Sequence, residues 1–431
     1  MRPNGRILAV YLAGVFIGAL DTSILGPVLP DIARGLHVSF TWTAWTITAY
    51  TVAYVATTAV AGAAGDRHGR GRLFLLGVAA FGAASLLAAL SRDFGLFVAA
   101  RALQGAAAGL VYPNAIASGT DQFPAERRGA ALGLFGAVFG LASIVGPNVG
   151  GALGQYVGWQ SIFWINVPFA LIVLGMGARL PAGQTRTHAL PDWLGGLGFA
   201  GFLATLLLLL SAAQVGLAVA CVLFLALFLW RQRATTPFLD TKPFRNPSGV
   251  AVIIGAALIG YDLAAAVFVP TLAQQALHFS VLESGVALMP AAFSGAVLAG
   301  LAGVLVDRIG PRAVLQVGLV AGVIGGVLLA LPHLTLVDFF AAMVFFGVAT
   351  ALTIGAPLNK LGMSLYRDEQ GGEALSLMAV FRSVGLAAGA VLMTIALARG
   401  GFTAMFGSVA IASLLGAIAF SLVSVRRVVA S

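Results

Sequence analysis

Hydrophobic positions along the chain gather in long, nearly uninterrupted blocks, and polar positions are confined to short segments between them. The blocks are about 18–25 residues long, which is the length that an α-helix needs to cross a hydrocarbon layer roughly 30 Å thick. Continuous apolar runs of this length predict helices, whereas alternation with a period of two residues would predict strands. Because backbone groups inside a bilayer must be satisfied within their own segment, the pattern predicts an all-α polytopic membrane protein.

Fourteen transmembrane helices are expected, at residues 7–29, 41–64, 72–91, 95–118, 130–153, 161–179, 193–211, 215–230, 248–270, 281–303, 313–331, 335–358, 372–397 and 402–425. This number depends on how residues 193–230 are interpreted. A single helix over these 38 residues would be about 57 Å long, far more than a bilayer requires. A hairpin that turns at residues 211–214 is therefore favoured.

The distribution of positive charge supports this hairpin. With fourteen spans and both termini in the cytoplasm, 19 of the 24 Lys and Arg residues fall in cytoplasmic segments, in line with the positive-inside rule. A single span at 193–230 would instead move Arg308, Arg312 and Lys360 to the outside. The net charge of +9 is dispersed among short loops, so it indicates orientation in the cell membrane rather than nucleic-acid binding.

Little in the sequence suggests catalysis, redox chemistry or metal binding. The single Cys221 lies in an apolar run and cannot form an intramolecular disulfide, and the sparse His and Cys residues show no metal-ligand spacing. Without a Gly-x-x-x-x-Gly-Lys-Ser/Thr loop, ATP is not expected as the energy source. The chain is expected to be a monomer without cofactors and not an enzyme. Arg2 and Arg6 resemble the start of a cleaved signal peptide, but Asp21 and the prolines that follow favour a retained first span.

An internal repeat divides the chain into halves. Four residues of a charged loop recur 241 residues later: Gly62, Asp66, Arg67 and Gly69 correspond to Gly303, Asp307, Arg308 and Gly310. The same offset superposes Asp21 on Asp262, in the first predicted helix of each half. We expect an N-terminal six-helix bundle at 1–180, a linker at 181–247 that contains the extra hairpin 193–230, and a C-terminal six-helix bundle at 248–431. Halves related in this way are typical of secondary transporters that alternate access.

Several motifs resemble those of the major facilitator superfamily, and specifically its fourteen-span drug–proton antiporter branch. The motifs are Leu20–Pro30 in the first helix, Gly62–Arg72 after the second, Arg101–Gly105 in the fourth, Gly146–Gly151 in the fifth, and the segments 159–168 and 192–195. The first-helix motif departs from the branch at Gly26, where Asn is usual, and at an unusual Pro27. The resemblance covers essentially the whole chain and implies proton-coupled drug efflux.

Asp21 and Arg101 are candidates for proton coupling. At 1.5 Å per residue along their helices, both fall in the outer half of the membrane at similar depth. A charge at the centre of a membrane helix costs roughly 2.5–3.5 kcal/mol, so such residues tend to pair and to face an internal cavity. The resemblance implies that their two helices line this cavity, where a carboxylate could exchange protons as its surroundings change. The alternative is a fixed pair that only orders the helices.

Asp262 is the third candidate for proton coupling. The position 241 residues after Arg101 is Ala342, so the second half keeps the acid and lacks the matching base. Arg382 could replace that base; alternatively, Asp262 could contact a cationic substrate, act as a second proton site, or be a solvated cavity residue. The candidate substrate-cavity residues are Tyr50, Tyr54, Gln104, Tyr112, Asn114, Asp262 and Arg382.

Two further motifs are expected to control conformation. The resemblance implies a cytoplasmic gating latch at Gly62, Asp66, Arg67, Gly69, Arg70, Asp307 and Arg308. The latch of the first copy should be the stronger, because the second copy has Pro311 where the first has Arg70. The arginines of the loop could also set the membrane topology, and this role is compatible with the latch. Gly146, Pro147, Gly150 and Gly151 would present a small-residue face to another helix. For this face the resemblance implies a seal against proton leak, and close packing alone is the alternative.

The leading hypothesis is a secondary active transporter that exports hydrophobic or amphiphilic drugs in exchange for protons, with the proton gradient as the energy source. Its partners would be an amphiphilic small molecule, protons and the lipid bilayer. The first alternative is an exporter or importer of a single metabolite, such as a sugar, an amino acid or a biosynthetic product. The second is a membrane-embedded enzyme or lipid flippase, for which the sequence shows no cluster of catalytic groups.

Overall fold

The computed structural model describes residues 5–124, 128–178, 180, 192–212, 214–234, 238, 246–363 and 371–423. The secondary structure of these residues is helical, which confirms the predicted all-α class. Parts of two predicted features lie outside the described residues: residues 181–191 and 239–245 of the predicted linker, and the last two residues of the predicted span at 402–425.

The chain packs into two compact units. The first comprises Met1–Phe238 and Val267–Val286, and the second comprises Leu239–Ala266 and Ala287–Ser431. Helix α11 (Pro247–Ala276) therefore begins in the second unit and ends in the first. The domain boundaries proposed from the repeat stay a prediction.

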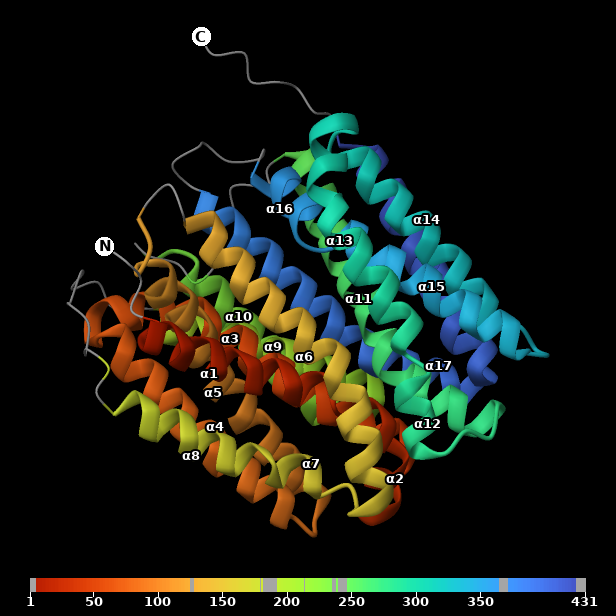
Figure 1. The fold of residues 1–431 in the computed structure, drawn as a ribbon, viewed down its shortest axis with the longest axis horizontal. Helices are drawn as coiled ribbons and strands as arrows, with labels where there is room; N and C mark the ends of the chain where they lie inside the picture. The colour runs from red at the N-terminus through yellow and green to blue at the C-terminus, as the bar shows by residue number, and fades with distance from the viewer. Residues whose placement is uncertain are drawn as a thin grey trace. The chain divides into compact units, whose positions relative to one another are not determined.

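The first unit contains the helices of the first predicted half, the extra hairpin, the end of α11, and α12. Their bounds are α1 (Gly5–Ser23), η1 (Gly26–Val28), α2 (Leu29–Gly35), η2 (Phe40–Thr43), α3 (Ala44–His68), α4 (Arg70–Leu90), α5 (Phe94–Thr120), α6 (Arg128–Tyr156), α7 (Ser161–Trp164), α8 (Asn166–Gly177), α9 (Trp193–Ser211), α10 (Val215–Arg231) and α12 (Val281–Val286). Helix α5 is central, since α1, α3 and α4 all pack against it, and α8 packs on α1 and α4 (Figure 1).

The second unit contains the first part of α11 and the helices after α12. Their bounds are α13 (Met289–Ile309), α14 (Pro311–Leu329), α15 (Leu336–Thr353), α16 (Ala356–Met363) and α17 (Gly371–Ser421). Helix α14 packs on both α15 and α17, while α13 packs on α15 (Figure 1). Helix α17 contains non-helical backbone at Gly400 and Gly401, which falls between two spans predicted from the sequence.

Ten helical segments of the described chain are long and apolar enough to cross a membrane, or eleven if the bent pair at Phe40–His68 forms one span. The segments Ser161–Gly177 and Val215–Arg231 are apolar but shorter. The multi-pass membrane architecture is therefore confirmed, and the number of fourteen spans stays a prediction.

Glycine and proline explain where helices break or turn. The first predicted span was expected to run to residue 29. Its α-helix ends at Ser23, and the chain continues through the 3₁₀ turn Gly26–Val28. The α-helical hydrogen bonds stop here because Pro27 has no backbone N–H to donate. The repeated loop turns at Gly69 in the first copy and Gly310 in the second, with φ of 94° and 84°. Such positive φ values favour glycine, so the repeat preserves the residue that lets α3 lead into α4 and α13 into α14.

Candidate functional site

The ion pair predicted between Asp21 and Arg101 is present and buried in the first unit. Arg101 Nη1 donates to Asp21 Oδ2 at 2.6 Å, and the two side chains are 1% and 0% exposed. Arg101 Nε also donates to the backbone carbonyl of Thr46 at 2.9 Å, which ties α5 to α3. Since a buried charge is costly unless paired and hydrogen-bonded, these contacts explain how α1 and α5 tolerate the two residues.

Further polar side chains complete the network around Asp21. Asn166 Nδ2 at the start of α8 donates to Asp21 Oδ1 at 2.8 Å, and Gln104 Nε2 donates to the same oxygen at 3.3 Å. Gln104 also accepts from Arg101 Nη1 at 2.7 Å and donates to Ser85 Oγ at 2.7 Å. The network therefore draws residues from α1, α3, α4, α5 and α8, and both carboxylate oxygens accept hydrogen bonds.

Sequence reasoning identified only part of this network. Gln104 was predicted to line a substrate cavity; the structure places it beside the ion pair, and its role in a cavity stays a prediction. Asn166 appeared within a motif but received no role, and Ser85 and Thr46 were not singled out. A polar residue in an apolar helix was the available signal for Asn166 and Ser85, because such residues tend to face other polar groups.

Four aromatic side chains extend from the ion pair in a row. The Arg101 guanidinium lies 4.7 Å from the centroid of the Tyr50 ring, within the range of a cation–π contact. Tyr50 stacks on Tyr54 at 6.3 Å, Tyr54 meets Tyr112 edge-on at 5.8 Å, and Tyr112 is followed by Phe139 at 6.3 Å. Three of the residues predicted to line a substrate cavity therefore form a continuous row, and one of them, Tyr50, contacts the ion pair.

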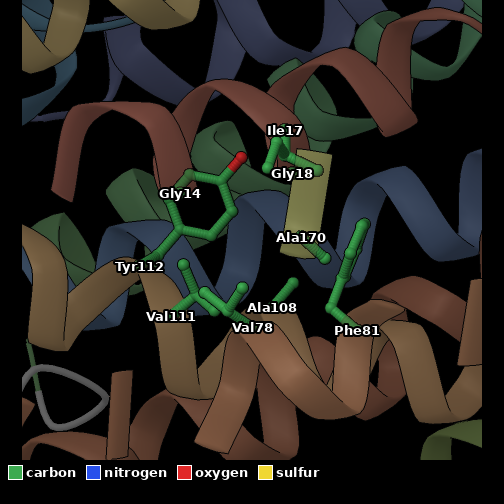
Figure 2. A pocket seen from close by; sticks show the side chains of 9 residues that line it. All are labelled: Gly14, Ile17, Gly18, Val78, Phe81, Ala108, Val111, Tyr112 and Ala170. Atoms are coloured by element: carbon green, nitrogen blue, oxygen red, sulfur yellow. The ribbon is translucent and has the colours of Figure 1, made fainter. Parts of the chain in front are cut away.

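A small apolar pocket lies beside this row, between α1, α4, α5 and α8. Its lining residues are Gly14, Ile17, Gly18, Val78, Phe81, Ala108, Val111, Tyr112 and Ala170. Figure 2 shows the Tyr112 hydroxyl group directed toward α1. A Cβ atom at Gly18 would lie 3.2 Å from that hydroxyl oxygen, so the glycine allows the close approach of the tyrosine. Tyr112 thus faces both the aromatic row and the pocket.

Asn114 lies elsewhere on α5. Its Nδ2 donates to the carbonyl of Leu110 at 2.8 Å and of Ala61 at 3.4 Å, and its Oδ1 lies against Gly65. It therefore links α5 to the end of α3 that leads into the charged loop. Its membership of a substrate cavity stays a prediction.

Asp262 occupies a different environment from Asp21. Its Oδ2 accepts a hydrogen bond from Ser413 Oγ of α17 at 2.7 Å, and its Oδ1 is buried without a hydrogen-bond partner. Arg382, the proposed substitute base, lies on α17 with its backbone carbonyl against Gly260 of α11. The role of Arg382 in charge neutralisation stays a prediction.

The two copies of the charged loop make different contacts. In the first, Arg70 Nε donates to Asp66 Oδ1 at 2.8 Å, and Arg70 Nη1 donates to Asp121 Oδ2 at 3.1 Å. In the second, Lys360 Nζ donates to Asp307 Oδ1 at 2.6 Å across an exposed contact. A single arginine that joins two carboxylates on two elements is a stronger connection than one exposed pair. Gating by these loops stays a prediction.

The fifth-helix motif packs tightly against the C-terminal part of the first predicted span. Helix α6 continues through Pro147, and a Cβ atom at Gly150 would lie 2.2 Å from the carbonyl oxygen of Ile24. A Cβ at Gly146 would lie 1.9 Å from Ser23 Oγ, and one at Gly151 would lie 2.9 Å from the carbonyl oxygen of Val281. The predicted small-residue face is therefore present, and its role as a proton seal stays a prediction.

The unusual Gly26–Pro27 sequence has a structural explanation. A Cβ at Gly26 would lie 3.0 Å from the carbonyl oxygen of Val267, so glycine permits the approach of the α11 end that belongs to this unit. The carbonyl of Pro27 accepts a hydrogen bond from Gln274 Nε2 at 2.7 Å, and Gln274 also donates to Ser284 at 2.9 Å. Residues 267–286 are thus joined to the first span by a hydrogen bond that no motif indicated.

No constellation in the described part of the chain could hold a metal ion through three or more His, Cys, Asp or Glu side chains.

Comparison with known proteins identifies the family. The family described as the Major Facilitator Superfamily matches residues 11–390. The chain belongs to the major facilitator superfamily. It is a transporter and not an enzyme.

Named relatives within the superfamily differ in what they transport. The chain is 31% identical over 416 residues to the tetracenomycin C resistance and export protein of Streptomyces glaucescens, covering 91% of this chain and 76% of that protein. It is 28% identical over 404 residues to the riboflavin transporter RibZ of Clostridioides difficile, covering 90% of this chain and 87% of that protein. A solved structure of the peptide transporter POT in complex with sulfate is similar in fold, with a TM-score of 0.75, 15% identity, and coverage of 97% of this chain and 94% of that one.

Replacement of Asn166 tests whether the network stabilises this superfamily member. We expect Asn166→Ala to lower the free energy of unfolding by about 1.5–3 kcal/mol, because a hydrogen bond to a buried carboxylate is lost. The measurement is equilibrium unfolding in mixed micelles. Asn148→Ala is the matched control, since Asn148 donates to the carbonyl of Ile144 in its own helix α6. Equal losses in the two variants would contradict a special role for Asn166.

Proposed function

We propose that this transporter exports hydrophobic or amphiphilic compounds in exchange for protons, by alternating access. The observation that carries the proposal is the Asp21 carboxylate, which is buried beside Arg101 among the apolar helices of the first unit. The energy source would be the proton gradient, without a cofactor. The transporter would act as a monomer in the cell membrane.

The contacts of Asp21 suit a group that gains and loses a proton. Its charge is stabilised by Arg101 and by two side-chain amides, Asn166 and Gln104. If substrate binding or a change of conformation moved any of these donors away, the buried carboxylate would favour its neutral form. Protonation and conformation would then be linked, which is what antiport requires.

The aromatic row at Tyr50, Tyr54 and Tyr112 supports an amphiphilic substrate. Aromatic faces bind apolar groups over large areas and tolerate differences in shape, while tyrosine hydroxyl groups add polar contacts. The similarity to a tetracenomycin C resistance and export protein supports efflux of drug-like compounds. Residues of this row would line the substrate route, with Gln104 adjoining the ion pair.

The membrane arrangement that we propose has fourteen spans and both termini in the cytoplasm. To the eleven spans counted with the bent pair, it adds the two shorter apolar helices at Ser161–Gly177 and Val215–Arg231, and it divides α17 at Gly400 and Gly401 into two spans. In this arrangement the first copy of the charged loop, with Arg70, would be a cytoplasmic latch. The Gly146–Gly151 face would be a seal against proton leak. The branch assignment to fourteen-span drug–proton antiporters is part of the same proposal.

A second candidate is transport of one metabolite. The similarity to a riboflavin transporter, with 90% of this chain covered, favours this candidate because riboflavin is a single defined compound. A competition assay separates the two: a broad exporter is inhibited by chemically unrelated apolar compounds, whereas a metabolite carrier is inhibited only by close analogues.

Collapse of the proton gradient tests the coupling. Proteoliposomes that contain the full chain and a fluorescent amphiphile should lose gradient-driven efflux when a protonophore is added, because the proton flux that drives antiport is removed. Valinomycin with potassium, which dissipates only the membrane potential, is the control. Efflux that continues unchanged after protonophore addition would rule out proton coupling.

A further inference from the structure

Two aromatic rings lie against the guanidinium of Arg101. The guanidinium carbon is 4.7 Å from the centroid of the Tyr50 ring, which belongs to α3, and 5.6 Å from the centroid of the Phe163 ring, which belongs to α7. All three side chains are buried. Since a cation–π contact is stronger when it is shielded from water, both rings help to stabilise a charge whose counter-ion is the Asp21 carboxylate.

The backbone at Tyr50 packs closely against α5. A Cβ atom at Gly105 would lie 2.0 Å from the carbonyl oxygen of Tyr50, so glycine is what allows this approach of the two helices. One turn earlier on α3, the carbonyl of Thr46 accepts the hydrogen bond from Arg101 Nε at 2.9 Å. Two residues of α3 therefore fix the position of the guanidinium, Thr46 through its backbone and Tyr50 through its ring.

The aromatic row connects Tyr50 with more accessible side chains. Tyr54, one turn further along α3, is half-buried, and its ring is nearly parallel to the Tyr50 ring, with 9° between the two planes. Tyr112 meets Tyr54 edge-on, and Phe139 beyond it is 47% exposed. Within the described part of the chain, the buried Tyr50 hydroxyl group has no hydrogen-bond partner. The neighbouring rings and Arg101, rather than a hydrogen bond of the hydroxyl group, therefore position the Tyr50 ring.

We propose that Tyr50 is a positioning residue that links the occupancy of the aromatic row by a planar aromatic compound to the proton on Asp21. Because aromatic rings pack in preferred offset and edge-on arrangements, a guest that packs against Tyr54 draws the Tyr50 ring out of its contact with Arg101. The guanidinium then depends more on Asp21 for neutralisation, which favours the charged carboxylate, and the proton leaves to solvent. This role of Tyr50 rests on the proposed proton-coupled export and names the side chain through which substrate and proton would be linked.

The test is the affinity of the purified full-length chain in detergent for ethidium, a planar aromatic cation whose charge is constant across the pH range used. Fluorescence anisotropy gives the dissociation constant from mildly acidic to mildly alkaline pH. If ethidium binding releases a proton, its affinity must rise with pH, because the coupling between two ligands is reciprocal. We expect the dissociation constant of the wild-type chain to fall by about fivefold or more as the pH rises.

Substitutions of tyrosine identify the ring that is responsible. Tyr50→Leu removes the ring at Arg101, so its dissociation constant should change by less than about twofold over the same pH range, whereas Tyr50→Phe keeps the ring and should retain the pH dependence. Tyr11→Leu is the matched control, since it also removes a buried tyrosine ring of the first unit, one that packs on Phe74 and is not among the two rings at Arg101. It should retain the pH dependence. If Tyr50→Leu does not fold, Tyr54→Leu takes its place and should likewise abolish the pH dependence, because it interrupts the row next to Tyr50.

Two results separate the role of Tyr50 from the proposed function. Efflux that survives a protonophore would contradict proton-coupled export and, with it, this role. Protonophore-sensitive efflux together with a Tyr50→Leu variant that keeps the wild-type pH dependence would overturn the role of Tyr50 alone. A wild-type chain that binds ethidium no better than empty micelles do, or with an affinity that does not change with pH, would overturn it as well.

Discussion

Asp21→Asn is expected to abolish proton-driven efflux while leaving membrane insertion intact. The amide cannot lose a proton, so the cycle of protonation and release that drives antiport stops at this position. The variant also leaves the Arg101 guanidinium buried without its counter-charge, and removal of one partner from a buried pair typically costs about 3–5 kcal/mol. Efflux from proteoliposomes should therefore fall to the level of vesicles without protein, and the yield of inserted protein should be measured in parallel.

Two controls separate loss of coupling from loss of structure. Asp31→Asn changes an acid of α2, just after the first predicted span; Asp31 pairs with Arg34 and is not part of the Asp21 network, so this variant should retain efflux. Substrate exchange without a gradient gives a second readout, because a folded carrier that has lost only proton coupling can still exchange substrate across the membrane. An Asp21→Asn variant with normal gradient-driven efflux would remove Asp21 from the mechanism.

Gly150→Ala is expected to destabilise the transporter strongly for a single added methyl group. The new Cβ would lie 2.2 Å from the carbonyl oxygen of Ile24 and 2.9 Å from its Cγ1, so α6 must move away from the chain after α1. Overpacking of this kind typically costs about 1–3 kcal/mol, and the displaced partner is backbone that cannot rotate aside. The midpoint of thermal unfolding in detergent should fall, and pH-gradient-loaded vesicles should leak protons faster if the Gly146–Gly151 face acts as a seal.

A second glycine of the same helix provides a control, because its replacement by alanine is expected not to destabilise the protein. A Cβ at Gly140 would have no heavy atom within 4 Å, and Gly140 also lies in α6. Replacement of an unobstructed helical glycine by alanine favours the helix by about 0.5–1 kcal/mol, so Gly140→Ala should leave stability unchanged or slightly higher. If Gly150→Ala and Gly140→Ala shift the unfolding midpoint in the same direction and by the same amount, the claim that Gly150 is required for close packing is wrong.

Much of the candidate site could be anticipated because the repeat and the charges are local features of the sequence. The single offset of 241 residues relates Asp21 to Asp262 and Gly69 to Gly310, and both glycines have the positive φ that the turn requires. The Asp21–Arg101 pair was predictable because two opposite charges at similar depth in apolar helices have few other ways to be neutralised. The partners Asn166 and Ser85 were not predictable, since many small polar residues in these helices satisfy themselves within their own turn, as Thr394 does.

The sequence by itself determined the class of the protein, its membrane helices and its relation to a transporter superfamily, because hydrophobic run length and motif spacing depend only on neighbours along the chain. Only the tertiary structure decided which polar groups meet. Asn166 reaches Asp21 across 145 residues, and Gln274 reaches the Pro27 carbonyl across 247. Such contacts follow from how helices rotate and pack against one another, and that rotation is weakly encoded in segments that are apolar on every face. The same reason explains why Asp21 and Asp262, equivalent in sequence, differ in what surrounds them.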